Sequence, residues 1–386
     1  MLVEVREPAS MIRDQGRSKT GGSAGTGRHT SPRTPRWSQW LPITGLAMVP
    51  LHTEAPSTAA VVVASVILIG CVIAAVHHGE IIAHKVGEPF GTLVLAGAVT
   101  VIEASLILAM MLSGSANPDL PRDTVFAAIM LILNGLVGGC LLMGGIRHGE
   151  QKFVLEGVNA ALCVLAAMAI LVLVLPGVAT DAPATHYSPA QLSFTALVST
   201  ILYGTFIFVQ TIRHRDYFLP EGTGDLAANA HAAPPSRRTV AASVFLLVAS
   251  LVSVIFLAKA LSGPVEAAVA AAALPRALVG ILIASLVLAP ESVAALRAAR
   301  RNRLQTSLNL ALGSALATIG LTIPVIAIAA LASGWPLSLA LDPESMTLLA
   351  LSLGVAILSF GTGRTTILQG AVHLVLLAAY VFTTAT

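Results

Sequence analysis

Long apolar stretches dominate the chain and constrain its fold more than any other feature. A helix that crosses a bilayer needs roughly 20 apolar residues, and the sequence holds about eleven runs near that length. We therefore expect an all-α polytopic membrane protein with about eleven transmembrane helices. The predicted spans cover about 40–52, 59–76, 89–112, 124–146, 154–176, 191–212, 239–262, 276–296, 304–333, 346–362 and 367–384.

The composition supports a membrane protein and argues against several other classes. Charged residues make up 11% of the chain, whereas soluble globular proteins carry about 25%. The formal net charge of +3 does not indicate a nucleic-acid-binding surface. The three cysteines lie inside apolar runs and form no C-x-x-C motif, so we interpret them as packing residues.

The polar segments divide the chain into two transmembrane halves. Residues 1–39 are rich in Arg, Ser, Gly, Thr and Pro, which predicts a disordered basic tail. We expect an N-terminal half over 40–212, a cytoplasmic linker over 213–238 with its Pro and Gly residues, and a C-terminal half over 239–386.

The basic residues predict the topology. With a cytoplasmic N-terminus and alternating spans, most basic residues fall in cytoplasmic loops, as the positive-inside rule requires. We therefore expect a multi-pass protein of the bacterial inner membrane with its N-terminus in the cytoplasm. The cytoplasmic basic residues would be Lys85, Arg147, Lys152, Arg213, Arg215, Arg237, Arg238, Arg297, Arg300, Arg301, Arg303 and Arg364.

Two apolar segments each carry a glutamate at mid-membrane depth. Glu103 lies in the middle of the 89–112 run, and Glu291 follows Pro290 within the 276–296 run. An ionised carboxylate at that depth costs roughly 2.5–3.5 kcal/mol on insertion scales, which suggests a functional use. A buried ion pair is the structural alternative, but neither segment has a basic residue at matching depth.

The predicted topology sends these two segments through the membrane in opposite directions. We expect a first repeat at about 87–146 and a second at about 276–333, related as the inverted repeats of secondary transporters. Pro89 and Pro290 could also interrupt their helices and free carbonyl oxygens as ligands, unless each only kinks its helix.

Glu103 and Glu291 would form a cation site through their carboxylate oxygens, and they are the predicted metal-binding residues. Desolvated carboxylates that lie close together take up protons when no cation is bound. Cation and proton would then compete for the same groups, and this competition is the basis of an exchange mechanism.

Neutral polar residues in the following helices are further candidates. Asn134 is deeply placed, so we favour ligation or a hydrogen bond to Glu103. For Ser314, Thr318 and Thr322, helix packing is at least as good an interpretation as ligation. Glu88 could be a gate or proton-entry group, or simply a helix N-terminal charge.

A histidine cluster precedes Glu88. His77, Glu80 and His84 could share a helix face and offer zinc ligands. We favour interfacial polar residues that close a span, and a proton-sensing role is a further alternative. His373 is interpreted as a helix–helix hydrogen-bonding group.

The sequence gives little support for enzymatic or nucleotide-driven activity. It contains no G-x-x-x-x-G-K-[ST] and no H-E-x-x-H, and its one match to G-x-S-x-G, at residues 21–25, lies in the polar N-terminal tail. We therefore expect no enzymatic activity, no cofactor and transport driven by ion gradients. The partners would be cations, protons and the lipid bilayer.

The glutamate segments resemble a known family. V-G-E-P-F-G-T-L-V-L-A-G-A-V-T-V-I-E-A-S-L-I, L-A-P-E-S-V-A-A-L-R-A and F-G-T-G-R-T-T-I-L-Q-G-A-V-H-L are similar to bacterial ChaA-type calcium/proton antiporters of the Ca²⁺/cation antiporter superfamily. The resemblance covers roughly 59–386.

The resemblance implies two inverted repeats and a central site with one acidic residue from each. These acids correspond to Glu103 and Glu291, and the family's polar positions correspond to Asn134 and to Gly313 with Ser314. Glu88 matches a glutamate of related proton-coupled exchangers. The wider superfamily often has G-N-A-[AP]-E, where this chain has V-T-V-I-E and V-L-A-P-E.

The resulting hypothesis is a Ca²⁺/H⁺ antiporter that expels Ca²⁺ from the cytoplasm by alternating access. A Na⁺ or K⁺/H⁺ antiporter with Ca²⁺ as a minor substrate is the alternative within transport. A passive cation channel is the alternative from another class, although channels usually need rings of like residues from an oligomer. A membrane-embedded enzyme ranks third.

Overall fold

The computed structural model describes residues 35–48, 57–87, 90–112, 118–178, 186–219, 235–275 and 277–386. Among these, the side chains of residues 90–93 and 95 are not described. Most of the predicted tail, most of the predicted linker, and Glu88 with Pro89 lie outside the described residues.

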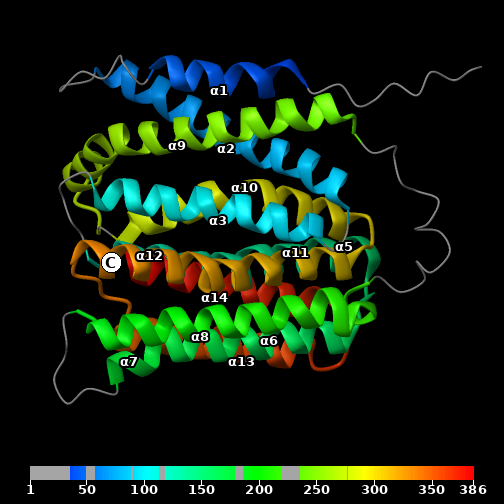
Figure 1. The fold of residues 1–386 in the computed structure, drawn as a ribbon. Coiled ribbons are helices and arrows are strands. Elements are labelled where there is room, and N and C mark those ends of the chain that lie inside the picture. Colours follow the sequence, from blue (N-terminus) through cyan, green and yellow to red (C-terminus); the bar gives the residue numbers. More distant parts are fainter. Residues whose placement is uncertain are drawn as a thin grey trace, which may run out of the picture. The chain divides into compact units, whose positions relative to one another are not determined.

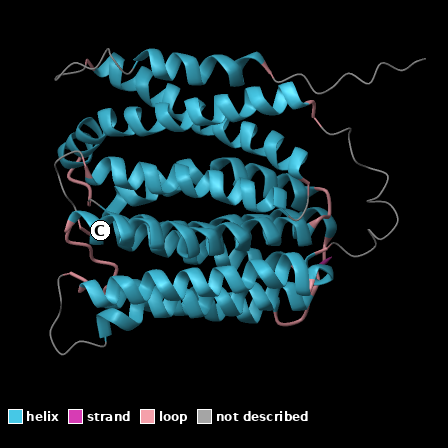
Figure 2. Ribbon diagram, in the orientation of Figure 1, coloured by secondary structure: helices cyan, strands magenta, loops and turns pink. Residues whose placement is uncertain are grey.

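The described chain is almost entirely helical (Figure 2), as the apolar runs predicted. The first half contains α1 (Arg36–Met48), α2 (Thr58–Val86), α3 (Phe90–Met111), α4 (Leu120–Met130), η2 (Leu131–Leu136), α5 (Val137–His148), α6 (Leu155–Ala169), η3 (Ile170–Val174), α7 (Leu175–Val178), α8 (Pro189–Phe208), η4 (Val209–Arg213) and η5 (Arg215–Phe218).

The second half repeats this pattern of long helices. It contains α9 (Arg237–Ala271), α10 (Ala277–Arg300), α11 (Leu304–Ala317), η7 (Thr318–Thr322), α12 (Ile323–Ser333), α13 (Pro343–Phe360) and α14 (Ile367–Ala385). The short strands β1 (Gln151–Lys152) and β2 (Arg364–Thr365) pair antiparallel between the two halves.

Every predicted span corresponds to a helical segment. Within the described residues, 9 segments are long and apolar enough to cross a membrane, and the apolar part of α3 adds a shorter one. Helix α1 has 13 residues and corresponds to the shortest predicted span. The all-α polytopic membrane fold is thus confirmed.

The helices run alternately in opposite directions, so their termini gather at two ends of the bundle (Figure 1). At one end, His148 at the terminus of α5 donates to the carbonyl oxygen of Arg300 at the terminus of α10, at 3.1 Å. At the other end, the amide of Tyr187 before α8 donates to the carbonyl oxygen of Leu337 beyond α12, at 2.8 Å.

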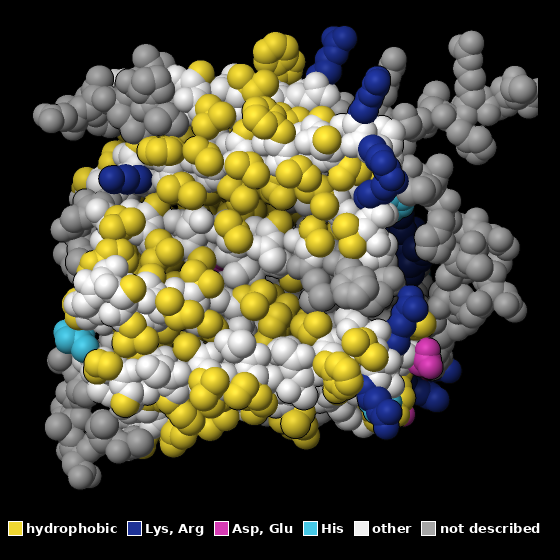
Figure 3. All heavy atoms as spheres, viewed as in Figure 1, with side chains coloured by type: hydrophobic (Ala, Val, Ile, Leu, Met, Phe, Trp, Pro, Cys, Tyr) yellow, Lys and Arg dark blue, Asp and Glu magenta, His cyan; other side chains and the backbone are white. Residues whose placement is uncertain are grey.

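We call the end at His148 and Arg300 the basic end. Figure 3 shows Lys and Arg side chains concentrated on that side of the molecule. The residues that the topology places there include Lys85, Arg147, Lys152, Arg213, Arg215, Arg237, Arg297, Arg300, Arg303 and Arg364. Arg122 and Lys259 lie towards the opposite end, so the predicted asymmetry of charge is present in the fold.

Helices α1, α2 and α9 pack together and lie against α3 (Figure 1). His78 of α2 links these three helices through its two ring nitrogens. One bonds to the hydroxyl of Ser243 in α9 at 3.3 Å, and the other bonds to the carbonyl oxygen of Ser38 in the first turn of α1 at 2.9 Å. A second and larger apolar core joins α4 to α8 with α10 to α14.

Helix α10, which carries Glu291, packs closely against α4. A Cβ added at Gly280 of α10 would lie 2.8 Å from the carbonyl carbon of Asp123 in α4. Only glycine allows this approach, as is common where membrane helices pack through small residues. The contact sets the position of α10, and therefore of Glu291.

Candidate ion-binding site

Glu103 is buried in the middle of α3, with 3% of its surface exposed. Its Oε2 atom accepts hydrogen bonds from the hydroxyls of Thr322 at 2.8 Å and Thr318 at 3.2 Å. Both donors belong to η7 in the C-terminal half of the chain. The carboxylate of α3 is therefore held by a helix from the other half, and these two threonines bind the acid rather than only packing between helices.

Thr318 and Thr322 lie four residues apart on the same face of the helix, so both hydroxyls can reach one oxygen. The turn that carries them, η7, is π-helical. Such a turn widens the helix locally and is frequent at functional sites. The corresponding helix of the first repeat contains a similar turn, η2, which includes Asn134. In each half, the helix that follows the acid-bearing helix thus contains a π-helical turn.

Glu291 is buried in α10, with 7% of its surface exposed. Its Oε2 atom is buried and has no hydrogen-bond partner among the described residues. A buried carboxylate oxygen without a partner is costly unless something binds it. This oxygen is therefore the strongest single indication of a ligand in the site.

Of the two alternatives at Pro290, an interruption of the helix does not occur, because α10 runs continuously from Ala277 to Arg300 with the proline inside it. Proline has no amide hydrogen, so the carbonyl oxygen of Leu286, four residues earlier, lacks its helical partner.

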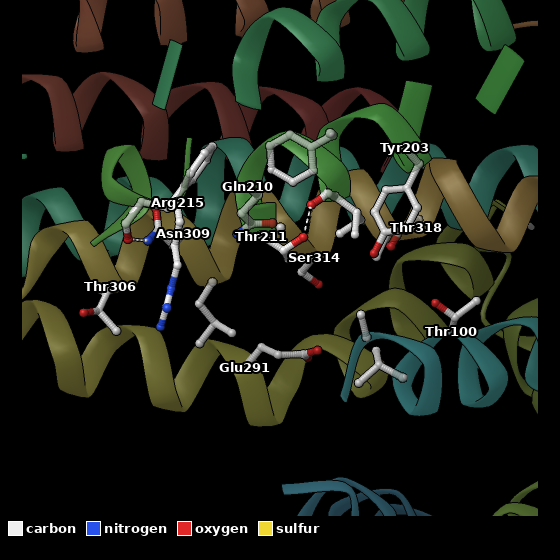
Figure 4. A pocket seen from close by; sticks show the side chains of 18 of the residues that line it. Thr100, Tyr203, Gln210, Thr211, Arg215, Glu291, Thr306, Asn309, Ser314 and Thr318 are labelled. Carbon is white, nitrogen blue, oxygen red and sulfur yellow. Dashed lines mark hydrogen bonds between the residues drawn. The ribbon is translucent and has the colours of Figure 1, made fainter. Parts of the chain in front are cut away.

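One cavity of about 410 Å³ contains both acids. Figure 4 shows Glu291 extending into it from α10, facing Ser314 and Thr318 of the α11–η7 helix. Thr100 of α3 and Tyr203 of α8 complete the deep part. All of these groups offer oxygen atoms, which are the ligands that Ca²⁺, Na⁺ and K⁺ share.

The cavity extends from the two acids towards the basic end only. On α3 it is lined by Ala96 to Glu103, the half nearer the basic end, and on α11 by residues from Thr306 onward. Arg215 and Leu219, in and after η5, line it at the level of the helix termini. Within the described residues, no lining group comes from the helix termini at the opposite end.

Three of the five predicted site residues therefore meet in one cavity: Glu103, Glu291 and Ser314. Glu88 lies outside the described residues. Asn134 does not line the cavity and does not bond to Glu103. Its amide nitrogen donates to the hydroxyl of Ser352 at 2.9 Å, and its amide oxygen lies 3.1 Å from Nδ1 of His373.

His373 is fully buried and links α14 to η2 through Asn134. Its predicted role as a helix–helix hydrogen-bonding group is confirmed. For Asn134 the sequence favoured ion ligation or a hydrogen bond to Glu103. In the structure its amide instead bonds to Ser352 of α13 and His373 of α14, because η2 turns the side chain towards these two helices.

In the histidine cluster near the end of α2, His77 and His78 contact other helices, whereas Glu80 and His84 are exposed. The His77 ring lies against Trp37 of α1 at a tilt of 43°, with ring centroids 5.7 Å apart, and His78 bonds to α1 and α9 as described above. Among the residues that the structure describes, no group of three or more His, Cys, Asp or Glu side chains could hold a metal ion together.

Sequence reasoning missed the contribution of α8, η4 and η5, which lie between the repeats. Tyr203, Gln210, Thr211 and Arg215 line the cavity from this segment. The only available signal was the polar series Q-T-I-R-H-R-D that ends an apolar run. That series looks like an ordinary membrane boundary, so it gave no reason to select these residues.

Comparison with known proteins defines the class. The chain matches the family model described as "Sodium/calcium exchanger protein" over residues 56–212 and 242–386. It is 46% identical over 360 residues to y4hA of Sinorhizobium fredii, named as an ionic transporter, which covers 92% of this chain and 97% of that protein. It is 39% identical over 309 residues to the "Sodium-potassium/proton antiporter ChaA" of Escherichia coli, covering 80% and 84%.

Solved structures share the fold. The "H+/Ca2+ Exchanger CAX" superposes with a TM-score of 0.67 at 15% identity, covering 89% of this chain and 86% of that one. Native YfkE gives a TM-score of 0.66 at 16% identity, covering 90% and 99%.

The chain therefore belongs to the sodium/calcium exchanger family, within the Ca²⁺/cation antiporter superfamily. It is a multi-pass transmembrane protein of a family of cation antiporters, which are transporters and not enzymes.

Proposed function

We propose that this chain exchanges cytoplasmic Ca²⁺ for protons across the bacterial inner membrane, using Glu103 and Glu291 for both ions. The observation that carries the proposal is the meeting of these two buried carboxylates, from helices of opposite direction, in one cavity open towards the basic end. Ser314 and Thr318 supply neutral oxygens beside them.

The orientation follows from the distribution of charge. Basic residues favour the cytoplasmic side of membrane proteins, so we assign the basic end to the cytoplasm and, with it, the N-terminus. The cavity then exposes the two acids to the cytoplasm. In this assignment the inverted repeats span about 87–146 and 276–333, and the halves span 40–212 and 239–386, joined by the linker 213–238.

Exchange arises because a cation and protons compete for the same oxygens. A cation binds the ionised carboxylates, whereas proton uptake neutralises them and leaves no charge to hold it. A rearrangement that closes the cytoplasmic cavity and opens the opposite side would then release one ion and admit the other.

Na⁺ or K⁺ in exchange for H⁺ is the second candidate, and one observation favours it. The Escherichia coli relative, which is 39% identical, is named for sodium, potassium and protons. A passive channel is disfavoured, because the lining that the described residues supply reaches the basic end and not the opposite end.

Everted membrane vesicles from cells without their own antiporters test the proposal. The lumen is acidified by respiration, and a quenched dye follows the pH gradient while Ca²⁺, Na⁺ or K⁺ is added separately. Ca²⁺ should collapse the gradient in the wild type. Glu103→Gln and Glu291→Gln should each abolish that response while the protein still inserts.

The matched control is Glu344→Gln, since Glu344 is exposed in the first turn of α13 at the opposite end. This variant should exchange at the wild-type rate. Full exchange by both buried-glutamate variants would refute the two-carboxylate mechanism. A response to Na⁺ or K⁺ without Ca²⁺ would select the second candidate, and no response to any cation would refute proton-coupled exchange.

A further inference from the structure

A tyrosine hydroxyl in the cavity lacks a protein partner. Tyr203 of α8 lines the deep part of the cavity, and 6% of its surface is exposed. Its hydroxyl makes no hydrogen bond to a described residue. Buried tyrosine hydroxyls usually have a partner, and Tyr187 shows the ordinary case, because its hydroxyl donates to the carbonyl oxygen of Val172 at 3.0 Å. The partner of the Tyr203 hydroxyl must therefore come from the contents of the cavity.

The Tyr203 ring is held in place by close packing against η7. A Cβ added at Gly320 would overlap the Cβ and the ring of Tyr203. Gly320 lies between the two threonines that bond to Glu103. The same turn therefore positions both the Glu103 carboxylate and the tyrosine ring, so that these two groups keep a defined relation to each other.

The tyrosine oxygen and the second acid enter the same space. Figure 4 shows the Tyr203 ring extending from α8 into the cavity, with its hydroxyl end towards Thr318. Glu291 enters the cavity from α10, and its Oε2 atom also has no partner among the described residues. The cavity thus contains an unpartnered carboxylate oxygen and an unpartnered neutral oxygen. Hard cations are bound by charged and neutral oxygen ligands together.

Packing does not account for the hydroxyl. A phenylalanine at position 203 would make the same ring contact with Gly320 and would bury no polar atom without a partner, which is costly. The hydroxyl is also not needed to hold the first acid, because Glu103 accepts its hydrogen bonds from η7. A ligand in the cavity explains why the oxygen is present.

We propose that the Tyr203 hydroxyl is a direct ligand of the transported cation, supplied by a helix that carries neither acid. The inference rests on the function proposed above and deepens it, because it adds a neutral oxygen to the two carboxylates. The phenol oxygen faces the ion and keeps its hydrogen, so it contributes a ligand without adding charge. Its partner is present when the site holds a cation and absent when protons replace that cation.

Tyr203→Phe is the direct test, because it removes the oxygen and keeps the ring. Exchange is measured in everted vesicles over a series of concentrations of Ca²⁺, Na⁺ and K⁺ separately. The half-maximal concentration of each exchanged cation should rise about tenfold, the lower end of the effect of one polar contact to a charged group. The maximal rate should change less, because both carboxylates remain.

Thermal unfolding of the purified protein in detergent separates ion ligation from packing. Without an added cation, Tyr203→Phe should unfold at the wild-type temperature or above it, because its hydroxyl has no described partner to lose. A cation that binds the folded state should raise the unfolding temperature of the wild type. This rise should be smaller in Tyr203→Phe at the same cation concentration.

Tyr187→Phe is the matched control. It removes a tyrosine hydroxyl that bonds to the protein and does not line the cavity. It should lower the unfolding temperature without a cation, because the bond to Val172 is lost. The half-maximal cation concentration and the cation-induced rise in unfolding temperature should both stay at the wild-type values.

Wild-type half-maximal concentrations for every exchanged cation in Tyr203→Phe would overturn the inference. A lower unfolding temperature without a cation, together with a full cation-induced rise, would also overturn it, because that pattern indicates a packing role. If wild-type vesicles respond to no cation, the proposed exchange fails. The cation-induced rise in unfolding temperature still shows in that case whether Tyr203 contributes to cation binding.

Discussion

Replacing Thr322 by valine should weaken cation binding, although no acid is altered. Valine has nearly the shape of threonine but cannot donate the 2.8 Å hydrogen bond to Oε2 of Glu103. A hydrogen bond to a charged group contributes about 1.5–3 kcal/mol. Bonds donated to a carboxylate stabilise its ionised form, which is the form that holds a cation.

The structure suggests the lower part of that range, because Glu103 keeps its second bond, from Thr318 at 3.2 Å. With about 1.4 kcal/mol for each factor of ten, the half-maximal cation concentration should rise about tenfold. Thr318→Val removes the longer bond and should have the smaller effect. Thr322→Ser retains the hydroxyl and should stay close to the wild type.

The assay is the vesicle exchange measurement at a series of cation concentrations, with protein level determined by immunoblot. Thermal unfolding in detergent shows whether the variants are folded. The reasoning would be refuted if Thr322→Val and Thr322→Ser had the same half-maximal concentration as the wild type. It would also be refuted if the serine variant were impaired as much as the valine variant.

Two further predictions concern the packing around the site. Asn134→Ala leaves the buried partners of the amide unpaired, which costs about 1–3 kcal/mol, so we expect a lower unfolding temperature in detergent with exchange retained in the folded fraction. Loss of exchange without loss of stability would instead make Asn134 part of the ion site. Gly280→Val should force α10 away from Asp123 of α4 and displace Glu291, which should reduce maximal exchange strongly. Gly354→Ala, where an added Cβ meets nothing within 4 Å and which does not line the cavity, should be tolerated.

The apolar spans could be predicted from sequence because they depend on a local property. A backbone inside a bilayer must satisfy its hydrogen bonds within its own segment, so each long apolar run becomes a helix whatever surrounds it. The positions of Glu103 and Glu291 and the opposite directions of their helices followed from counting spans. The asymmetry of the basic residues supported that count.

The partners of these acids could not be predicted in the same way. Which face a helix presents depends on its rotation and on neighbours far away in the chain, and a π-helical turn shifts that face again. Thr318 and Thr322 thus bond to Glu103 from the other repeat. Asn134, by contrast, is turned towards His373.

The sequence by itself determined the class of fold, the number of helices and the two buried acids, since the cost of charge in lipid makes such residues conspicuous. Only the tertiary structure decided that the acids share one cavity, that this cavity extends to the basic end, and that α8, η4 and η5 contribute to its lining. These features depend on packing between segments that are distant in sequence, which no local pattern encodes.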